Sequence, residues 1–207
     1  MDASRIALAG GSYGGYMVDR VATGTDRFKA IVSHAGLRDL RMFQGDTDAP
    51  WYFQRIFGDP LTRPERYEAD SPHLEVAKIR TPMLVIHGAK DYRVPIGQGA
   101  ALIQELQRHE VPDKYLYFPD ENHWILRPNH TRLWYETFLN FGRPRRRGRR
   151  STHEAHAAEP GEGAPSDDAR VIPSPREPHF VGSPPPTGDR GLRLRRPAGF
   201  RSCRREE

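Results

Sequence analysis

The sequence contains a single cysteine, Cys203, so no disulfide can form within the chain. Cysteine content therefore does not indicate whether the protein belongs to an oxidising or a reducing compartment. Long hydrophobic runs are also missing, and no stretch approaches the ~20 apolar residues that a membrane span needs. The first residues lack the basic-then-apolar order of a secretory signal peptide. We therefore expect no membrane partner and a cytoplasmic location.

Common signatures of metal and nucleotide sites are missing too. No His-Glu-x-x-His or Cys-x-x-Cys spacing, both typical of zinc sites, is present. The glycines near residue 10 cannot be aligned to G-x-G-x-x-G, and no Gly-Lys-Ser/Thr follows them. We expect neither a metal ion nor an organic cofactor.

Lysine is absent from residues 142–207, where 15 arginines stand against nine acidic residues and 10 of the chain's 19 prolines occur. Such a segment cannot bury enough apolar surface to offset its chain entropy. We predict a folded domain over residues 1–141 and a disordered tail over residues 142–207, with no element that docks on the domain. The arginine clusters would bind nucleic acid or another polyanion only nonspecifically. An out-of-frame read of a GC-rich gene would give the same composition.

Residues 1–141 are nearly neutral, with 17 basic and 18 acidic residues, and give no electrostatic reason to expect nucleic acid. Short apolar segments alternate there with helical patterns, which predicts an α/β fold with a doubly wound, mostly parallel sheet. Residues 34–80 are expected to form a long connection whose aromatic residues mostly pack locally. The predicted strands are 5–9, 28–33, 82–88 and 114–118, and the predicted helices are 15–23, 97–109 and 129–141.

The pentapeptide Gly10–Gly14 reads G-G-S-Y-G and lies between a predicted strand and a predicted helix. In that context G-x-S-x-G is typical of a sharp turn that exposes a nucleophilic serine. Small residues at Gly10 and Gly14 are expected to let the strand and the helix pass close together. Ser12 is therefore the candidate nucleophile.

A serine hydroxyl is a weak nucleophile and needs a base, which in turn needs a carboxylate to orient it. Asp91 lies just past the third predicted strand and His123 just past the fourth. Carboxyl ends of parallel strands gather at one edge of a sheet, where such folds place their ligands. The order of Ser12, Asp91 and His123 along the chain is also that of α/β-hydrolase triads.

Other histidines and carboxylates compete for these roles. His34 also follows a strand, but no carboxylate at a strand end lies between it and the serine. His87 belongs inside a strand, and His109 stands where a helix should end. Asp120 and Glu121 are close to His123 in sequence, but a carboxylate from the preceding strand end fits the required order better.

The residues around these three positions resemble the prolyl oligopeptidase family of serine peptidases over roughly residues 3–141, in particular its acylaminoacyl peptidase and dipeptidyl aminopeptidase branch. The resemblance implies an α/β-hydrolase fold and cleavage of short peptides through an acyl-enzyme. It makes Ser12 the nucleophile, His123 the general base and Asp91 the residue that orients the base. It further implies that the Tyr13 N–H is an oxyanion donor and that Arg93 holds a substrate carbonyl.

The chain also departs from that family's pattern. The strand before Ser12 starts near residue 5, whereas the family's catalytic domain has several earlier strands. The family's His-Gly-Gly loop and its β-propeller have no counterpart. We expect the C-terminal half of a catalytic domain, with the missing N-terminal part and propeller as partners. The alternatives are an esterase with the same triad, or an inactive truncated fragment with a polyanion-binding tail.

Overall fold

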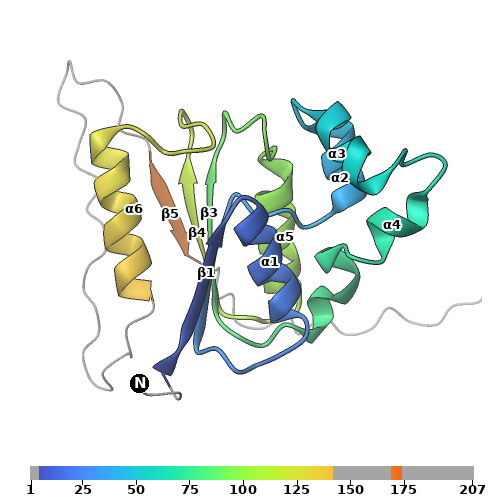
Figure 1. The fold of residues 1–207 in the computed structure, drawn as a ribbon. Helices are drawn as coiled ribbons and strands as arrows, with labels where there is room; N and C mark the ends of the chain where they lie inside the picture. Colours follow the sequence, from blue (N-terminus) through green and yellow to red (C-terminus); the bar gives the residue numbers. More distant parts are fainter. Residues whose placement is uncertain (1–4, 142–168, 174–207) are drawn as a thin grey trace, which may run out of the picture. The chain divides into compact units, whose positions relative to one another are not determined.

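The computed structural model describes residues 5–141 and 169–173, which contain a five-stranded, mostly parallel sheet (Figure 1). The strands lie in the order β1-β2-β3-β4-β5, which is also their order in the chain. The first four pair in parallel, and the fifth pairs antiparallel with β4. Their bounds are Ala7–Gly11 for β1, Ala30–His34 for β2, Met83–Gly88 for β3, Asp113–Phe118 for β4 and Arg170–Pro173 for β5.

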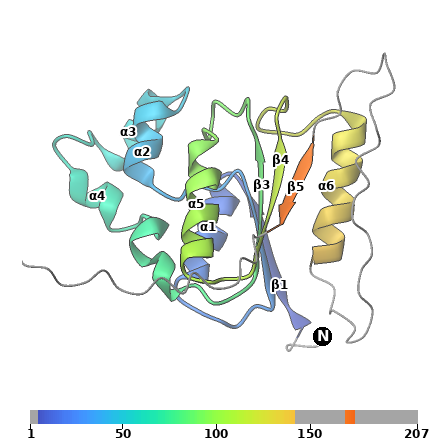
Figure 2. The same ribbon diagram turned by 180° about the vertical axis from the view of Figure 1, so that it is seen from behind.

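Helices cover both faces of this sheet, as the sequence predicts. Helices α1 (Tyr13–Ala22) and α5 (Gly97–Arg108) lie on one face and α6 (Pro128–Phe141) on the other (Figures 1 and 2). Every residue of β3 is buried, because apolar clusters form on both of its sides. The continuous apolar run of β3 is thus explained by burial from two directions.

The predicted long connection between β2 and β3 contains four short helical segments. Asp39 caps the first of them by accepting hydrogen bonds from the N–H groups of Arg41 and Met42. The other three begin with a proline in the first turn, where its missing N–H costs nothing. Such prolines also signal turns, which is why the sequence suggested a loop. The segments are α2 (Leu40–Asp46), α3 (Pro50–Phe57), α4 (Pro64–Glu68) and the 3₁₀-helix η2 (Pro72–Lys78).

The segment Arg170–Pro173 corrects one expectation about the tail. It forms β5 and pairs with β4 in the register Tyr115↔Ile172, so part of residues 142–207 does dock on the sheet. Four strands were predicted, and β5 is the fifth. Disorder of residues 142–168 and 174–207 stays a prediction, because those residues lie outside the described ones.

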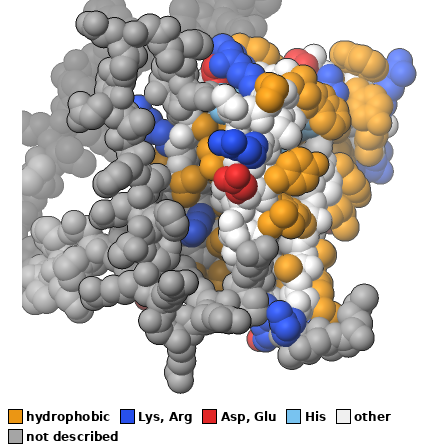
Figure 3. Space-filling model, turned by 90° about the vertical axis from the view of Figure 1, so that its left-hand side faces the viewer, with side chains coloured by type: hydrophobic (Ala, Val, Ile, Leu, Met, Phe, Trp, Pro, Cys, Tyr) orange, Lys and Arg blue, Asp and Glu red, His pale blue; other side chains and the backbone are white. Residues whose placement is uncertain are grey.

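Hydrophobic side chains reach the surface on the side of α6 (Figure 3). On α6 itself Tyr135 and Leu139 are exposed, whereas Trp134 and Phe138 pack against the core cluster on that face of the sheet. None of the helices within residues 5–141 is long and apolar enough to cross a membrane. The cytoplasmic location stays a prediction.

Candidate active site

Ser12 occupies the sharp turn between β1 and α1. Its φ of 58° and ψ of −120° lie in a region that residues with a side chain rarely adopt, at a cost of about 1–3 kcal/mol. The turn is held by a hydrogen bond from the Ser12 N–H to the His34 carbonyl (2.8 Å) and by one from the Tyr16 N–H to the Ser12 carbonyl (2.9 Å). The geometry is that of a nucleophile elbow, as the sequence predicts.

The close approach of β1 and α1 depends on Gly10. A Cβ added there would lie 2.1 Å from the Gly14 carbonyl oxygen, which no rearrangement of a side chain could relieve. The expectation for Gly14 itself is wrong, since a Cβ there would meet no atom within 4 Å. The second close contact is made by Gly15, whose added Cβ would lie 2.7 Å from the Gly36 Cα.

Asp91 and His123 are joined directly. Asp91 Oδ2 lies 2.7 Å from His123 Nδ1, and Asp91 Oδ1 accepts hydrogen bonds from the N–H groups of Arg93 (3.0 Å) and Val94 (2.9 Å). With Asp91 ionised, Nδ1 carries the proton and Nε2 is left as the basic nitrogen of the ring. The Asp91 side chain has no exposed surface, and its orientation is fixed by these donors.

The rival carboxylates bind elsewhere. Asp120 forms an ion pair with Arg127, and Glu121 accepts a hydrogen bond from His130 Nδ1 at 2.7 Å. Glu121 also accepts from the N–H groups at positions 126 (2.9 Å) and 127 (3.0 Å). Its backbone carbonyl accepts from the Lys90 N–H at 2.9 Å. Glu121 therefore ties the loop that carries His123 to the loop that carries Asp91, a role that its position in the sequence does not reveal.

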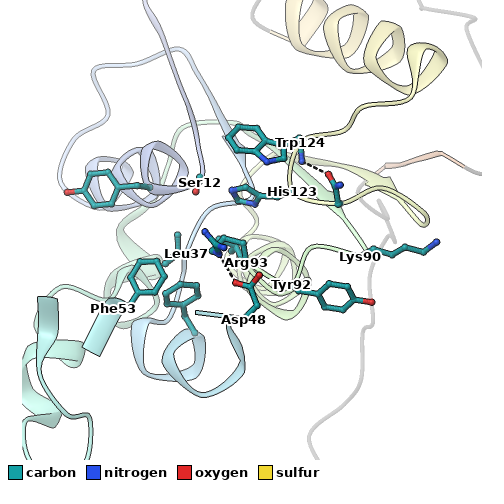
Figure 4. A pocket seen from close by; sticks show the side chains of 13 residues that line it. Ser12, Leu37, Asp48, Phe53, Lys90, Tyr92, Arg93, His123 and Trp124 are labelled. Atoms are coloured by element: carbon teal, nitrogen blue, oxygen red, sulfur yellow. Dashed lines mark hydrogen bonds and ion pairs between the residues drawn. The ribbon is translucent and has the colours of Figure 1, made fainter. Parts of the chain in front are cut away.

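Ser12 and His123 border the same pocket, which has a volume of about 390 Å³. Figure 4 shows the His123 ring turned toward Ser12, while Lys90 and Tyr92 point away. Between the described side chains there is no hydrogen bond from Ser12 Oγ to His123. Catalytic hydrogen bonds are often long without substrate and tighten when it binds. The structure thus brings the three predicted residues to one site.

One wall of the pocket is apolar. Phe43 and Phe53 pack edge to face with ring centroids 4.6 Å apart, and Leu37 and Val94 complete this wall. Two of the aromatic residues in the connection between β2 and β3 therefore line the pocket. Trp51, in contrast, is mostly exposed.

Arg93 lies at the same pocket and is held by Asp48. Its Nε donates a hydrogen bond to Asp48 Oδ1 at 2.6 Å, which raises the pKa of Arg93. Two further hydrogen bonds support the pair, each 2.8 Å long: the Asp48 N–H donates to the Tyr92 carbonyl, and the Thr47 hydroxyl donates to the Arg93 carbonyl. Asp48 was missed from the sequence, because it belongs to no motif and lies 45 residues from its partner.

Tyr13 is the first residue of α1, so its N–H has no partner inside the helix. It borders the pocket beside Ser12. An N–H at the start of a helix is well suited to bind developing negative charge.

His34, the other histidine at a strand end, is a poor base. Burial lowers the pKa of His34 to about 4, with smaller contributions from nearby histidines. Its ring lies 5.9 Å from that of Trp134, on the α6 side of the sheet. This supports the choice of His123 over His34.

Comparison with known protein families identifies the family of the chain. Residues 1–143 match the model of the peptidase S9 family, described as the prolyl oligopeptidase family. The chain belongs to this family. It shares 36% identity over 149 residues with dipeptidyl-peptidase 5 of Aspergillus fumigatus, and 37% over 147 residues with dipeptidyl-peptidase 5 of Porphyromonas gingivalis. These matches cover 68% of this chain but only 20% and 22% of the two relatives.

Two solved peptidase structures are also similar to this chain. An acylaminoacyl peptidase of Pyrococcus horikoshii has a TM-score of 0.65 and 28% identity, covering 68% of this chain and 24% of that one. A puromycin-hydrolyzing peptidase of Mycobacterium tuberculosis has a TM-score of 0.65 and 30% identity, covering 68% and 22%. The partial α/β-hydrolase fold predicted from the sequence is thereby confirmed. In the part of the chain that the structure describes, no group of three or more His, Cys, Asp or Glu could hold a metal ion.

Proposed function

We propose that this prolyl oligopeptidase family member is a serine peptidase that cleaves short peptides through an acyl-enzyme. The observation that carries the proposal is the 2.7 Å contact between Asp91 Oδ2 and His123 Nδ1 at the pocket that Ser12 also lines. A base oriented by a buried carboxylate, beside a serine on a strained turn, is the arrangement that activates a hydroxyl.

In the proposed reaction His123 Nε2 takes the Ser12 proton while Ser12 Oγ attacks the carbonyl carbon of the substrate. The Tyr13 N–H donates to the resulting oxyanion. His123 then returns the proton to the leaving amine, which departs and leaves an ester on Ser12. Water, deprotonated by His123, attacks that ester, and the serine recovers its proton as the acid product leaves.

The pocket also favours a class of substrate. Arg93, oriented by Asp48, would donate from its remaining guanidinium N–H groups to a substrate carbonyl. The wall formed by Leu37, Phe43, Phe53 and Val94 would accept an apolar side chain. Similar proteins are called dipeptidyl-peptidase 5 and acylaminoacyl peptidase, which supports peptides as substrates.

The chain spans about a fifth of the length of the curated relatives it matches. We therefore propose that it is the C-terminal part of a catalytic domain. Its proposed partner is the preceding part of such a domain, together with the other segments that the relatives contain. Strand β1 has a partner on one side only within the described sheet. That open edge is where a preceding strand would pair.

A fluorophosphonate probe tests the nucleophile. Ser12 should be labelled, and Ser12→Ala should abolish labelling. Ser33→Ala is the matched control and should leave it intact, because Ser33 is fully buried in β2. Labelling that survives Ser12→Ala would show that another residue reacts. A panel of aminoacyl-nitroanilides and acyl esters would then separate a peptidase from an esterase.

A further inference from the structure

His87 is a buried histidine next to the proposed triad that has no role in the reaction described above. It lies near the end of β3 with no exposed surface. Its Nε2 is 2.7 Å from the Val94 carbonyl oxygen and 3.6 Å from Asp91 Oδ2. Asp91 thus has two histidine rings near one of its oxygens, and only that of His123 is within hydrogen-bond distance.

The contact to Val94 fixes the protonation of the ring. A carbonyl oxygen can only accept, so His87 Nε2 must carry a proton. Burial lowers the pKa of His87, which keeps the ring neutral and its Nδ1 bare. Nδ1 has no hydrogen-bond partner among the described residues and faces α5, where a Cβ added to Gly99 would lie 2.5 Å from it.

The same contact completes the anchoring of a turn. The N–H groups of Arg93 and Val94 are bound by Asp91 Oδ1, so the turn closes on the carboxylate that it carries. The Val94 carbonyl, however, is held from outside the turn, by His87 on β3. The ring in turn is confined by Gly99 of α5. The position of Asp91 Oδ2 therefore depends on a chain of contacts that begins in the sheet.

We propose that His87 is a positioning residue: its Nε2–H holds the Val94 carbonyl, fixes the turn from Asp91 to Val94 and so aims Asp91 Oδ2 at His123. This inference rests on the proposed roles of Ser12, Asp91 and His123. A histidine that only filled the core would be replaced without loss by an apolar side chain of similar size. A positioning histidine needs its donor.

Two substitutions separate these roles in the full chain. His87→Leu fills the space but has no donor, whereas the amide of His87→Gln can donate from a position close to that of ring Nε2. His109→Gln, at an exposed helix end, is the matched control. The first readout is fluorophosphonate labelling of Ser12, with kinact and KI measured separately. The second is the NMR signal of the proton between His123 Nδ1 and Asp91, which does not depend on reactivity.

For His87→Leu we expect kinact to fall by about 10²-fold with KI unchanged, because displacement of a catalytic group by ~1 Å has an effect of this size. The NMR signal of the proton between His123 Nδ1 and Asp91, which we expect at low field in the wild type, should no longer appear there. His87→Gln should recover a large part of both readouts, and His109→Gln should match the wild type. A folded His87→Leu variant with the kinact and the NMR signal of the wild type would overturn the inference.

If His87→Leu does not fold, Gly99→Ala provides the second variant. Alanine is favourable in a helix, but here its methyl group would press on the His87 ring. The same loss of kinact and of the low-field signal is expected, and unchanged values would overturn the inference. If the wild type is not labelled at Ser12, the proposed function fails, and the NMR signal alone decides: its loss in His87→Leu or Gly99→Ala supports positioning by His87, and its persistence refutes it.

Discussion

At the scale of single residues, Asp19 is an ionisable group that the proposed reaction does not use. It lies on α1 with no exposed surface, and neither carboxyl oxygen makes a hydrogen bond of normal geometry within the described residues. A Cβ added to Gly36 would lie 2.5 Å from Asp19 Oδ2 and 2.3 Å from Ser33 Oγ, so these two side chains converge on Gly36. Burial raises the pKa of Asp19 well above its ordinary value, and Ser33 offsets only part of this.

Asp19→Asn should stabilise the chain, and the gain should grow with pH. Because the pKa of Asp19 is raised in the folded state, its protonation stabilises the fold fully at pH values below the unfolded pKa of about 3.9. This contribution is lost as pH rises through the pKa of the folded state. Each unit by which the pKa of Asp19 differs between the folded and unfolded states corresponds to about 1.4 kcal/mol of stability. Urea unfolding of both proteins at pH 5 and pH 8 would measure the difference. An equal loss of stability at both pH values would contradict the prediction.

Asp91→Asn should separate orientation from folding. The amide cannot accept from His123 in the same way and favours the wrong ring tautomer, so Ser12 labelling should fall by roughly 10³–10⁴-fold. Asp120→Asn is the control, because Asp120 binds Arg127 rather than His123. The check is the rate of fluorophosphonate labelling at neutral pH. Equal losses in the two variants would mean that Asp91 is not the orienting carboxylate.

The sequence predicted Ser12, Asp91 and His123 because each follows a strand and the order of their types is distinctive. It did not predict Asp48 or Glu121, because their partners come from other segments of the chain. Asp48 meets Arg93 across 45 residues, and Glu121 binds N–H groups whose direction depends on the fold of the loop. Contacts of this kind leave no local pattern for a reader of the sequence.

At the scale of elements, the loop between β4 and α6 depends on Glu121. Ile125 in this loop has a φ of 51°, so the backbone there is held in a region that costs energy. Burial opposes the charged form of Glu121, but the hydrogen bonds from positions 126 and 127 and from His130 outweigh it and lower the pKa of Glu121. The charged carboxylate thus stabilises the loop that carries His123.

Glu121→Gln should destabilise the chain by about 1–3 kcal/mol at neutral pH, because the amide nitrogen would oppose an N–H donor that is now bound. Since its pKa is lowered in the folded state, the contribution of Glu121 is present above its unfolded value of about 4.3 and lost as pH falls through the folded value. The gap between the two proteins should therefore narrow below about pH 4. Thermal unfolding at pH 7 and pH 3.5 measures it, with exposed Glu136→Gln as control. A gap independent of pH would contradict this assignment.

Strand β5 changes what truncation should do. A chain ending at residue 175 keeps β5, whereas one ending at residue 141 exposes the edge of β4. We expect the chain that ends at residue 175 to have the melting temperature of the full chain. The chain that ends at residue 141 should melt at a lower temperature. Equal melting temperatures would show that β5 contributes nothing. The sequence missed β5 because four residues in a segment rich in arginine and proline carry too little apolar periodicity.

At the scale of the whole molecule, two observations support the proposal that a preceding strand pairs with β1. One is the open edge of β1, and the other is the small part of the relatives' length that the chain covers. Residues Ala7, Ala9 and Gly11 of β1 are exposed, although the strand carries the proposed nucleophile at its end. The sequence did predict the layers and the parallel pairing, since periodicity and strand spacing determine them. Element ends shifted by one or two residues, because helix caps and strand pairing set them.

The chain as given should hydrolyse activated esters better than peptides, and slowly. The Tyr13 N–H is the one oxyanion donor that we assign, and loss of one donor of a pair costs about 10²–10³-fold in turnover. Joining the preceding part of a relative's catalytic domain to this chain should raise kcat/KM for aminoacyl-nitroanilides by that factor. Ser12→Ala in the joined protein is the control. Full peptide turnover by the chain alone would mean that the site needs no further donor.

The order of the strands also bears on when the site becomes reactive during synthesis. Each parallel strand pairs with the one made just before it, so the sheet can grow as the chain leaves the ribosome. Ser12 is set in its turn once β2 has paired with β1, Asp91 follows β3, and His123 follows β4. The proposed nucleophile is thus the first of the three to be placed, and the proposed base is the last. A nascent chain would therefore carry Ser12 without His123 until the loop after β4 has formed.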